Sequence, residues 1–436
     1  MNRLCRLILL GPIFLAAQTL PAGELTQGPW LYSTLYTTPS GLRSARVQPG
    51  LDILAAEFFA PLKGKTVGVV TNHTGRTRDG QFIQNLVAVA PGVRLRALFG
   101  PEHGFTGNLS AGQRVADDSD TDTGVRIFSL YGENTKPTPE QLAGINVVLL
   151  DLQDVGARYY TYVSTLTMVM EACAELGIAV WVLDRPNPVR GDYMAGPILE
   201  PEYASFVGMH TVPIRHGLTL GEMAIMINEQ GWLPGGVHVD LTVVPVAGWR
   251  ATMWWDQTDL VWIPPSPNIP DAETALAYLG MCLFEGTNIS EGRGTLSPFS
   301  LIGAPWIDGV ALARLLNRQG LPGVDFVAAT FEPRSIEGMA EYPKYEGQEC
   351  GGIRLRITDR NTFQPIHTAA VMIHILRETY PRRFAWNTVH MDRLWGSDAF
   401  RNYIDYGRNI AAHPSTYAAD RDAFYSLRQP YLIYER

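Results

Sequence analysis

The stretch FGPEHGFTGN sets a Glu-His pair, Glu102 and His103, between small, turn-forming residues. The pair follows directly on the apolar run Val93–Phe99. Two interpretations compete: a turn that happens to carry a carboxylate, or a strand that ends by presenting Glu102 to a substrate.

A second polar stretch, FEGTNISEGRGTLSPF, crowds Glu285, Asn288, Glu291 and Arg293 between glycines. Glycine lets the backbone approach a ligand or adopt a positive φ, and such a polar loop is typical of a binding site. A purely structural tight loop is the alternative. Together with Glu102, the stretch would supply the paired carboxyl groups that a glycosidase needs. One protonates the leaving oxygen, and the other is ionised and acts as nucleophile or base.

Polar clusters also follow the apolar runs that resemble strands. Because ligands bind at the carboxyl ends of the strands in open parallel sheets, clusters far apart in sequence would meet at one rim. The candidate substrate-binding residues at these ends are Asn72, His103, Asp151, Asp154, Arg158, Arg185 and Asn187. Asp151 and Asp184 could equally close turns after their strands. His73, His103 and Asp154 lack HxH or HExxH spacing, so no metal site is predicted.

The segment HGLTLGEMAIMI contains two further candidates, His216 and Glu222. Glu222 follows Thr219 by three residues and precedes an amphipathic helix, which favours a capping box over catalysis. His216 stays a candidate for substrate binding.

The elements that must position these residues alternate between strand and helix. Apolar, largely β-branched runs predict buried strands at Lys65–Asn72, Arg94–Gly100, Ile145–Asp151 and Ile178–Asp184. Tyr159–Gly177 is long enough for a helix closed by a glycine, and TPEQLAG, which begins at Thr138, resembles a helix start with a capping box. Such βαβ units predict an α/β fold, a Rossmann-like doubly wound parallel sheet with helices on both faces. No GxGxxG fingerprint follows the first strand, so we expect no nicotinamide, flavin or other cofactor.

The chain divides into four segments by composition. Residues 1–22 resemble a signal peptide, with Arg3 and Arg6 before an apolar stretch that is too short to span a membrane. Residues 23–48 are rich in Thr, Ser, Pro and Gly and are predicted to be a linker or arm. Residues 49–270 form the Rossmann-like domain, and residues 271–436, after a proline-rich passage, form a smaller α/β or α+β domain.

The composition excludes several classes of function. The net charge of −8 gives no electrostatic footprint for nucleic acid. Cys173, Cys282 and Cys350 lack CxxC spacing and are predicted to be buried, unpaired thiols.

The signal pattern predicts an exported protein, periplasmic or secreted, without a membrane span in its mature form. Trp254 and Trp255 are predicted to line a sugar subsite, to pack a homodimer, or to lie in the core.

Six motifs in this order resemble one family. They are PEHGF, DLQDVGARYYTYVST, DRPNP, PIRHGLTLGE, PPSPNIP and EGTNISEGRGT. From about Pro49 to the C-terminus, the chain resembles the NamZ-type exo-β-N-acetylmuramidases. The resemblance implies two domains with an active site in the cleft between them. It also implies the release of non-reducing, terminal β-1,4-linked N-acetylmuramic acid (MurNAc) from peptidoglycan fragments, including MurNAc-GlcNAc and muropeptides, without a cofactor.

The glutamate of the family's PEHG motif corresponds to Glu102, which we expect to be the general acid/base. The partner carboxylate is expected to be Glu291 or Glu285, with assistance by the substrate's own acetamido group as an alternative. The lactyl carboxylate of muramic acid needs a cation, for which the candidates are Arg158, Arg185, Arg215 and Arg293. A non-catalytic muropeptide-binding or sensory protein is the second hypothesis, and a metal-dependent hydrolase or deacetylase is the third.

Overall fold

The computed structural model describes residues 25–37, 46–106, 118–132 and 134–436. The predicted signal peptide, residues 1–22, therefore lies outside the described residues. Among the described residues, no helix is long and apolar enough to cross a membrane.

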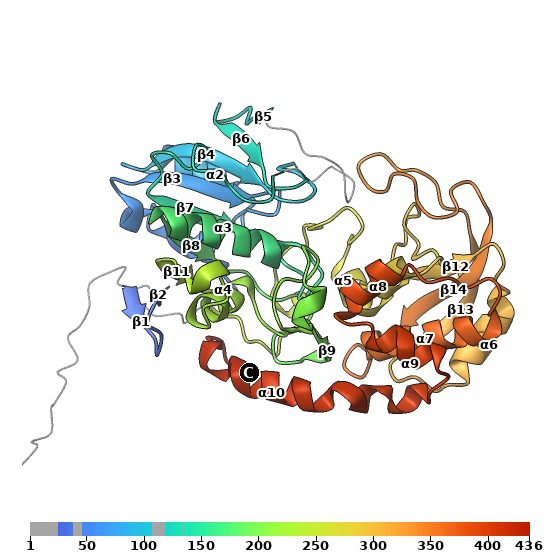
Figure 1. Ribbon diagram of the computed structural model, residues 1–436. Helices are drawn as coiled ribbons and strands as arrows, with labels where there is room; N and C mark the ends of the chain where they lie inside the picture. Colours follow the sequence, from blue (N-terminus) through green and yellow to red (C-terminus); the bar gives the residue numbers. More distant parts are fainter. Residues whose placement is uncertain (1–24, 38–45, 107–117, 133) are drawn as a thin grey trace, which may run out of the picture.

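The first part of the chain is built on a nine-stranded sheet with the order β1-β2-β11-β8-β7-β3-β4-β6-β5. Every neighbouring pair from β2 to β6 is parallel, and only the edge strands β1 and β5 pair antiparallel. Figure 1 shows these strands stacked from β5 at the top to β1 at the lower left. The strands are β1 (Leu25–Gln27), β2 (Ser33–Tyr36), β3 (Thr66–Thr71), β4 (Arg94–Gly100), β5 (Asp118–Ser119), β6 (Arg126–Ser129), β7 (Val147–Asp151), β8 (Ala179–Leu183) and β11 (Leu241–Val244).

Helices cover both faces of this sheet, because its strands are apolar on both sides. Val69 packs in one core cluster with residues of α1 (Gly50–Ala56) and α2 (Ile83–Val89). Val70, the next residue, faces the opposite cluster with α3 (Tyr162–Leu176) and α4 (Leu220–Glu229). The predicted doubly wound α/β architecture is therefore confirmed.

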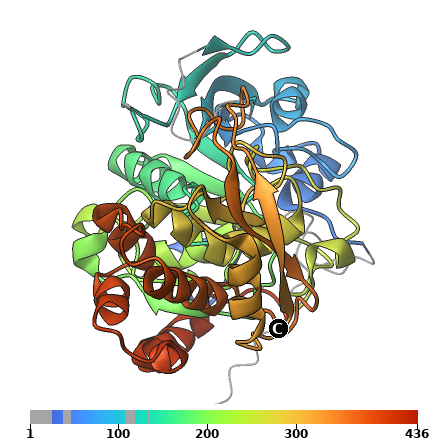
Figure 2. The same cartoon turned by 90° about the vertical axis from the view of Figure 1, so that its right-hand side faces the viewer.

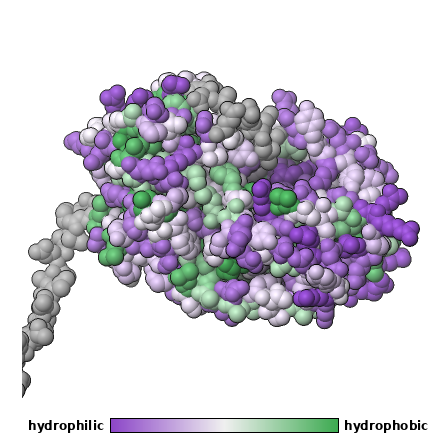
Figure 3. Space-filling model, in the orientation of Figure 1, coloured by the Kyte–Doolittle hydropathy of each residue, from purple (hydrophilic) through white to green (hydrophobic). Residues whose placement is uncertain are grey.

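The second part of the chain has its own antiparallel sheet with the order β12-β14-β13. Figure 2 looks onto this part, whose strands (orange) lie beside gold and red helices. On the face shown in Figure 3, the surface of this part is mostly hydrophilic, whereas apolar patches gather over the first part. The elements are α5 (Ala272–Met281), β12 (Leu301–Ala304), α6 (Gly309–Asn317), β13 (Val324–Phe331), β14 (Cys350–Ile357), α7 (Pro365–Thr379), α8 (Thr388–Trp395), α9 (Ala399–Asp405) and α10 (Ala418–Arg428).

Two local predictions need correction. Residues 23–48 were expected to be a linker or arm, but β1 and β2 extend the main sheet, with Leu241 of β11 beside Ser33. These strands are too short and polar to show a periodicity. At Thr138 the expected capping box is present, since Gln141 N donates to Thr138 Oγ1 over 3.3 Å and Thr138 N donates back to Gln141. It closes a turn instead of a helix.

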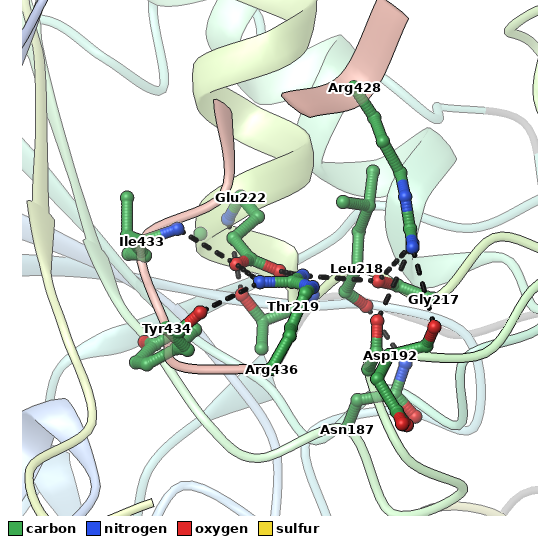
Figure 4. A network of polar contacts seen from close by, with 12 residues as sticks. Asn187, Asp192, Gly217, Leu218, Thr219, Glu222, Arg428, Ile433, Tyr434 and Arg436 are labelled. Carbon is green, nitrogen blue, oxygen red and sulfur yellow. Dashed lines mark hydrogen bonds and ion pairs between the residues drawn. The ribbon is translucent and has the colours of Figure 1, made fainter. Parts of the chain in front are cut away.

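The last residues of the chain return to the first part (Figure 4). Tyr434 Oη donates to Asp184 Oδ2 at 2.5 Å, and Arg436 donates to Glu222 through both Nη atoms at 2.8 and 3.0 Å. Glu222 also completes the capping box with Thr219, as predicted. The C-terminal tail thus ties the two parts together on the side of α4.

Candidate functional site

A cleft of about 570 Å³ lies between the two parts of the chain. It is lined by Glu102 and His103 from the turn after β4, and by Glu285 from the short 3-10 helix Cys282–Gly286 that follows α5. Glu291 and Arg293 line it from the loop after this helix. Residues that were predicted from two distant motifs therefore meet in one hollow. The carboxyl end of β4 delivers one side of it, as expected for an open parallel sheet.

Glu102 sits in a tight turn at the end of β4. Gly104 N donates to Pro101 O at 3.0 Å, and His103 and Gly104 both have positive φ, 71° and 75°. A non-glycine residue in this region is strained, and such strain is concentrated at functional sites. Thr161, just before α3, donates its hydroxyl to Glu102 Oε2 at 2.6 Å. The turn and this hydrogen bond fix the direction of the carboxyl group.

Glu285 is held as a carboxylate. Arg293 Nη2 lies 2.8 Å from Glu285 Oε1, and His390 Nε2 lies 3.4 Å from Glu285 Oε2. Burial alone would raise the pKa of Glu285, but the charge of Arg293 and the hydrogen bonds from His390 and Arg293 lower this pKa to about 2. Glu285 therefore remains ionised at neutral pH and cannot donate a proton to a leaving group.

Glu291 is almost completely buried and faces two cations. Lys344 Nζ lies 3.0 Å from Glu291 Oε2, and Arg293 Nε lies 3.7 Å from Glu291 Oε1. Lys344 was not a predicted site residue, because it follows Glu291 by more than fifty positions in a loop without a motif. Its contacts give Glu291 a fixed orientation at the wall of the cleft.

Aromatic side chains make up much of the remaining wall. They are Tyr131, Tyr159, Tyr160, Phe206, Tyr278, Phe299 and Tyr342. Rings with a polar tip suit a ligand that has both apolar and hydroxylated surface, as a sugar does. Of this group, Tyr159 and Tyr160 lie in one motif of the sequence and Phe299 ends another, but the sequence alone does not assign these rings to the cleft.

Arg158 does not line the cleft, so the structure does not place it where the predicted role in anion binding requires. The side chain is buried, with Nη1 donating to Pro197 O and Val212 O and Nη2 donating to Leu394 O and Trp395 O, at 2.7 to 2.9 Å. Because four carbonyl oxygens take these four hydrogen bonds, the guanidinium joins the two parts of the chain.

Arg185 and Arg215 also lie outside the cleft and have partners elsewhere, so the structure does not bring them to the place predicted for the lactyl group. Arg185 forms a two-pronged pair with Asp151, with Nε 2.5 Å from Oδ1 and Nη2 2.9 Å from Oδ2. Asp151, a predicted binding residue, is the partner in this pair and does not line the cleft. Arg215 donates to Val189 O and stacks at 4.6 Å on the ring of Tyr193.

Asp154 and His216, two predicted binding residues, form a buried pair that does not line the cleft. His216 Nε2 lies 3.8 Å from Asp154 Oδ2, which accepts a hydrogen bond from Gly156 N at 2.6 Å. Burial raises the pKa of Asp154 to about 7 and lowers that of His216 to about 3. At neutral pH the imidazole is uncharged, so the pair is no salt bridge.

Three asparagines of the predicted site make hydrogen bonds within the protein. Asn72 donates to the hydroxyl of Tyr162 at 2.6 Å, and Asn187 donates to Leu218 O at 2.9 Å. Asn288 Nδ2 donates to Arg383 O at 2.8 Å. The structure does not bring any of the three into the cleft with Glu102, as a role in substrate binding there would require.

Several other predictions can be compared with the described residues. Cys173, Cys282 and Cys350 are free and buried, as predicted. Trp254 and Trp255 are buried in the core, which leaves them unavailable to a sugar or a second copy. Within the described ranges, no group of three or more His, Cys, Asp or Glu side chains could hold a metal ion.

A larger cavity of about 750 Å³ lies between the segment after β9 (Ala195–Ile198) and α10. Its wall holds Glu200 and Asp420 but no residue predicted for catalysis. The smaller cleft gathers three carboxyl groups, two of which, Glu285 and Glu291, face cations. We therefore assign the candidate active site to the smaller cleft.

Comparisons with known proteins give matches over most of the chain. Residues 67–273 match the family model of the N-terminal part of the exo-beta-N-acetylmuramidase NamZ, and residues 276–434 match that of its C-terminal part. The chain is 42% identical over 393 residues to the peptidoglycan beta-N-acetylmuramidase NamZ of Bacillus subtilis (strain 168), covering 90% of this chain and 92% of the relative.

Two crystal structures of DUF1343 family proteins from Bacteroides fragilis NCTC 9343 share the fold. The first superposes with a TM-score of 0.81 at 33% identity and covers 90% of this chain and 100% of its own. The second has a TM-score of 0.73 at 33% identity, with 89% and 99% covered.

Proposed function

This chain belongs to the family of the exo-β-N-acetylmuramidase NamZ and is a glycoside hydrolase. On this basis we propose how its cleft cleaves peptidoglycan fragments. The substrate is a non-reducing, terminal MurNAc in β-1,4 linkage. The observation that supports this function most directly is the meeting of Glu102 with Glu285 and Glu291 in one sugar-sized cleft. A muropeptide-binding or sensory protein without activity would not need this set of carboxyl groups.

The three carboxyl groups have different environments, which suggests different roles. Glu102 is the general acid that protonates the glycosidic oxygen, because Glu285 stays ionised beside Arg293. Glu285 and Glu291 provide negative charge that stabilises the oxocarbenium-like transition state. One of these two carboxylates acts as the nucleophile or base, or orients the acetamido group of the substrate. If it is Glu291, Lys344 holds it in position.

Muramic acid adds an anionic lactyl ether to the sugar. Of the four arginines considered for this anion, Arg293 alone lines the cleft. Its Nε and Nη2 face Glu285, which leaves the donors on Nη1 for a second carboxylate. We assign the lactyl carboxylate to this edge of the guanidinium.

The role of Glu102 is tested with Glu102→Gln and two substrates. A general acid contributes about 10²- to 10⁴-fold, so kcat for MurNAc-GlcNAc should fall by about that factor. An aryl muramide should lose far less, because its phenolate leaves without protonation. Equal losses on both substrates would show that Glu102 is not the acid, and near-normal turnover of the disaccharide would remove it from catalysis. An unchanged melting temperature and substrate affinity are the controls.

We also propose that the protein is exported, to the periplasm or outside the cell. The proposal is supported by the pattern of residues 1–22, where two arginines precede the apolar run Leu7–Ala17. A peptidoglycan substrate fits this location.

A further inference from the structure

The rim of the cleft carries a large aromatic side chain that the proposed chemistry does not use. Tyr342 lines the cleft, yet 85% of its surface is exposed. Its backbone has a φ of 51°, in the left-handed region that strains a non-glycine residue. Phe58 has the same two features, a φ of 52° and 73% exposure, but only Tyr342 of the two lines the cleft, so its position there is the reason to ask what its ring does.

The loop that carries Tyr342 is held on both sides of its tip. Lys344 Nζ donates to Phe284 O at 2.8 Å. Tyr345 Oη donates to Asn288 O at 2.6 Å. On the other side, Asn268 Nδ2 donates to Met339 O at 2.6 Å. Tyr342 therefore projects from a fixed frame, and a ring held in this way can receive a ligand with little loss of conformational entropy.

The same loop relates Tyr342 to the reacting end of the cleft. Lys344, two residues further on, contacts Glu291, whose side chain is only 5% exposed. The cleft thus extends from buried carboxylates to an exposed ring. In an exo-acting enzyme the terminal sugar occupies the closed end, and the rest of the substrate points toward the mouth.

We infer that Tyr342 is the platform for the sugar on the reducing side of the cleaved bond, the GlcNAc of MurNAc-GlcNAc. This inference rests on the proposed function. The face of an aromatic ring carries partial negative charge and attracts the weakly positive C–H groups on one face of a pyranose. Tyr342 would then determine how well the enzyme distinguishes a disaccharide from a simple glycoside.

The test measures binding without turnover, in the Glu102→Gln background. The ligands are MurNAc-GlcNAc and methyl N-acetyl-β-muramide, and the readout is the ratio of their dissociation constants by titration calorimetry. Tyr342→Ala should reduce the advantage of the disaccharide by about 3- to 10-fold, the scale of one aromatic contact. Tyr342→Phe, which keeps the ring, should preserve the ratio.

Tyr406 offers a matched control, since it is a tyrosine with 75% exposure outside this cleft. Tyr406→Ala should leave the ratio at its starting value. An unchanged ratio in Tyr342→Ala, or an equal loss in Tyr342→Phe, overturns the inference while the proposed function stands. Failure of both ligands to bind Glu102→Gln would overturn the proposed function and the inference with it.

Discussion

Replacing Arg158 by methionine tests whether this arginine holds the structure together or binds the substrate. Its guanidinium is buried and donates to four carbonyl oxygens, two in the first part of the chain and two at the end of α8. Burial lowers the pKa of Arg158 to about 9, so the side chain still carries its charge at neutral pH. Methionine keeps the packing of the aliphatic part of the side chain but removes every hydrogen-bond donor of the guanidinium group.

The magnitude follows from the four carbonyl groups that lose a donor. A buried acceptor without a partner costs about 1 kcal/mol at the low end of the measured range, which gives about 4 kcal/mol for four. The variant no longer has to bury a charge, and this offsets part of the loss. We therefore expect the free energy of unfolding to fall by about 2 to 4 kcal/mol.

The assay is urea unfolding of Arg158→Met beside a control arginine. Arg356 pairs with Asp325 on the exposed face of β14 and β13, with 64% and 51% of the two side chains exposed. Arg356→Met should change the free energy of unfolding by less than about 0.5 kcal/mol, as exposed pairs contribute little.

Kinetics on the folded variants complete the comparison. Arg293→Lys should weaken muramyl substrates far more than lactyl-free glucosaminyl analogues, because lysine lacks the second edge of the guanidinium. Arg158→Met should affect the two substrate classes equally. Wild-type stability together with a selective loss of muramyl substrates in Arg158→Met would refute the structural role.

Two predictions remain. The pKa of Asp154 is raised from 3.8 to about 7 by burial, so the folded state binds the proton more tightly than the unfolded state. The contribution of Asp154 to the free energy of unfolding should therefore fall as the pH rises from about 4 to about 7, by as much as about 4 kcal/mol. The buried His216 acts in the opposite sense, so the measured quantity is the difference in free energy of unfolding between the wild type and Asp154→Asn, by urea unfolding. A difference that is the same at pH 4 and pH 8 would contradict the prediction. If the protein is exported, N-terminal sequencing of the mature form should begin near residue 23, and an intact Met1 would contradict export.

The fold was largely accessible from the sequence, because its central strands are continuous apolar runs. The run that ends at Gly100 predicted β4, and the turn after it brought Glu102 to the rim, as the geometry of parallel sheets requires. By contrast, β2 is only four residues long and half polar, so its pairing with β11 depends on tertiary contacts.

The roles of the charged residues were less accessible, since they depend on which groups meet in space. Arginine is a residue type that often binds anions, but the sequence does not show that four carbonyl groups converge on Arg158. Lys344 was missed for the opposite reason, because its contact with Glu291 joins two loops without a common motif.

The C-terminal tail has a consequence for how the protein reaches its native state. Asp184 and Glu222 are completed by Tyr434 and Arg436, which are separated from them by 250 and 214 positions. These two contacts cannot form until almost the entire chain has been synthesised. Contacts of such long range slow folding. The first part of the chain therefore lacks these contacts until the C-terminal residues are available. Chaperones that shield unfinished sheets would therefore matter more for this enzyme than for one whose halves close independently.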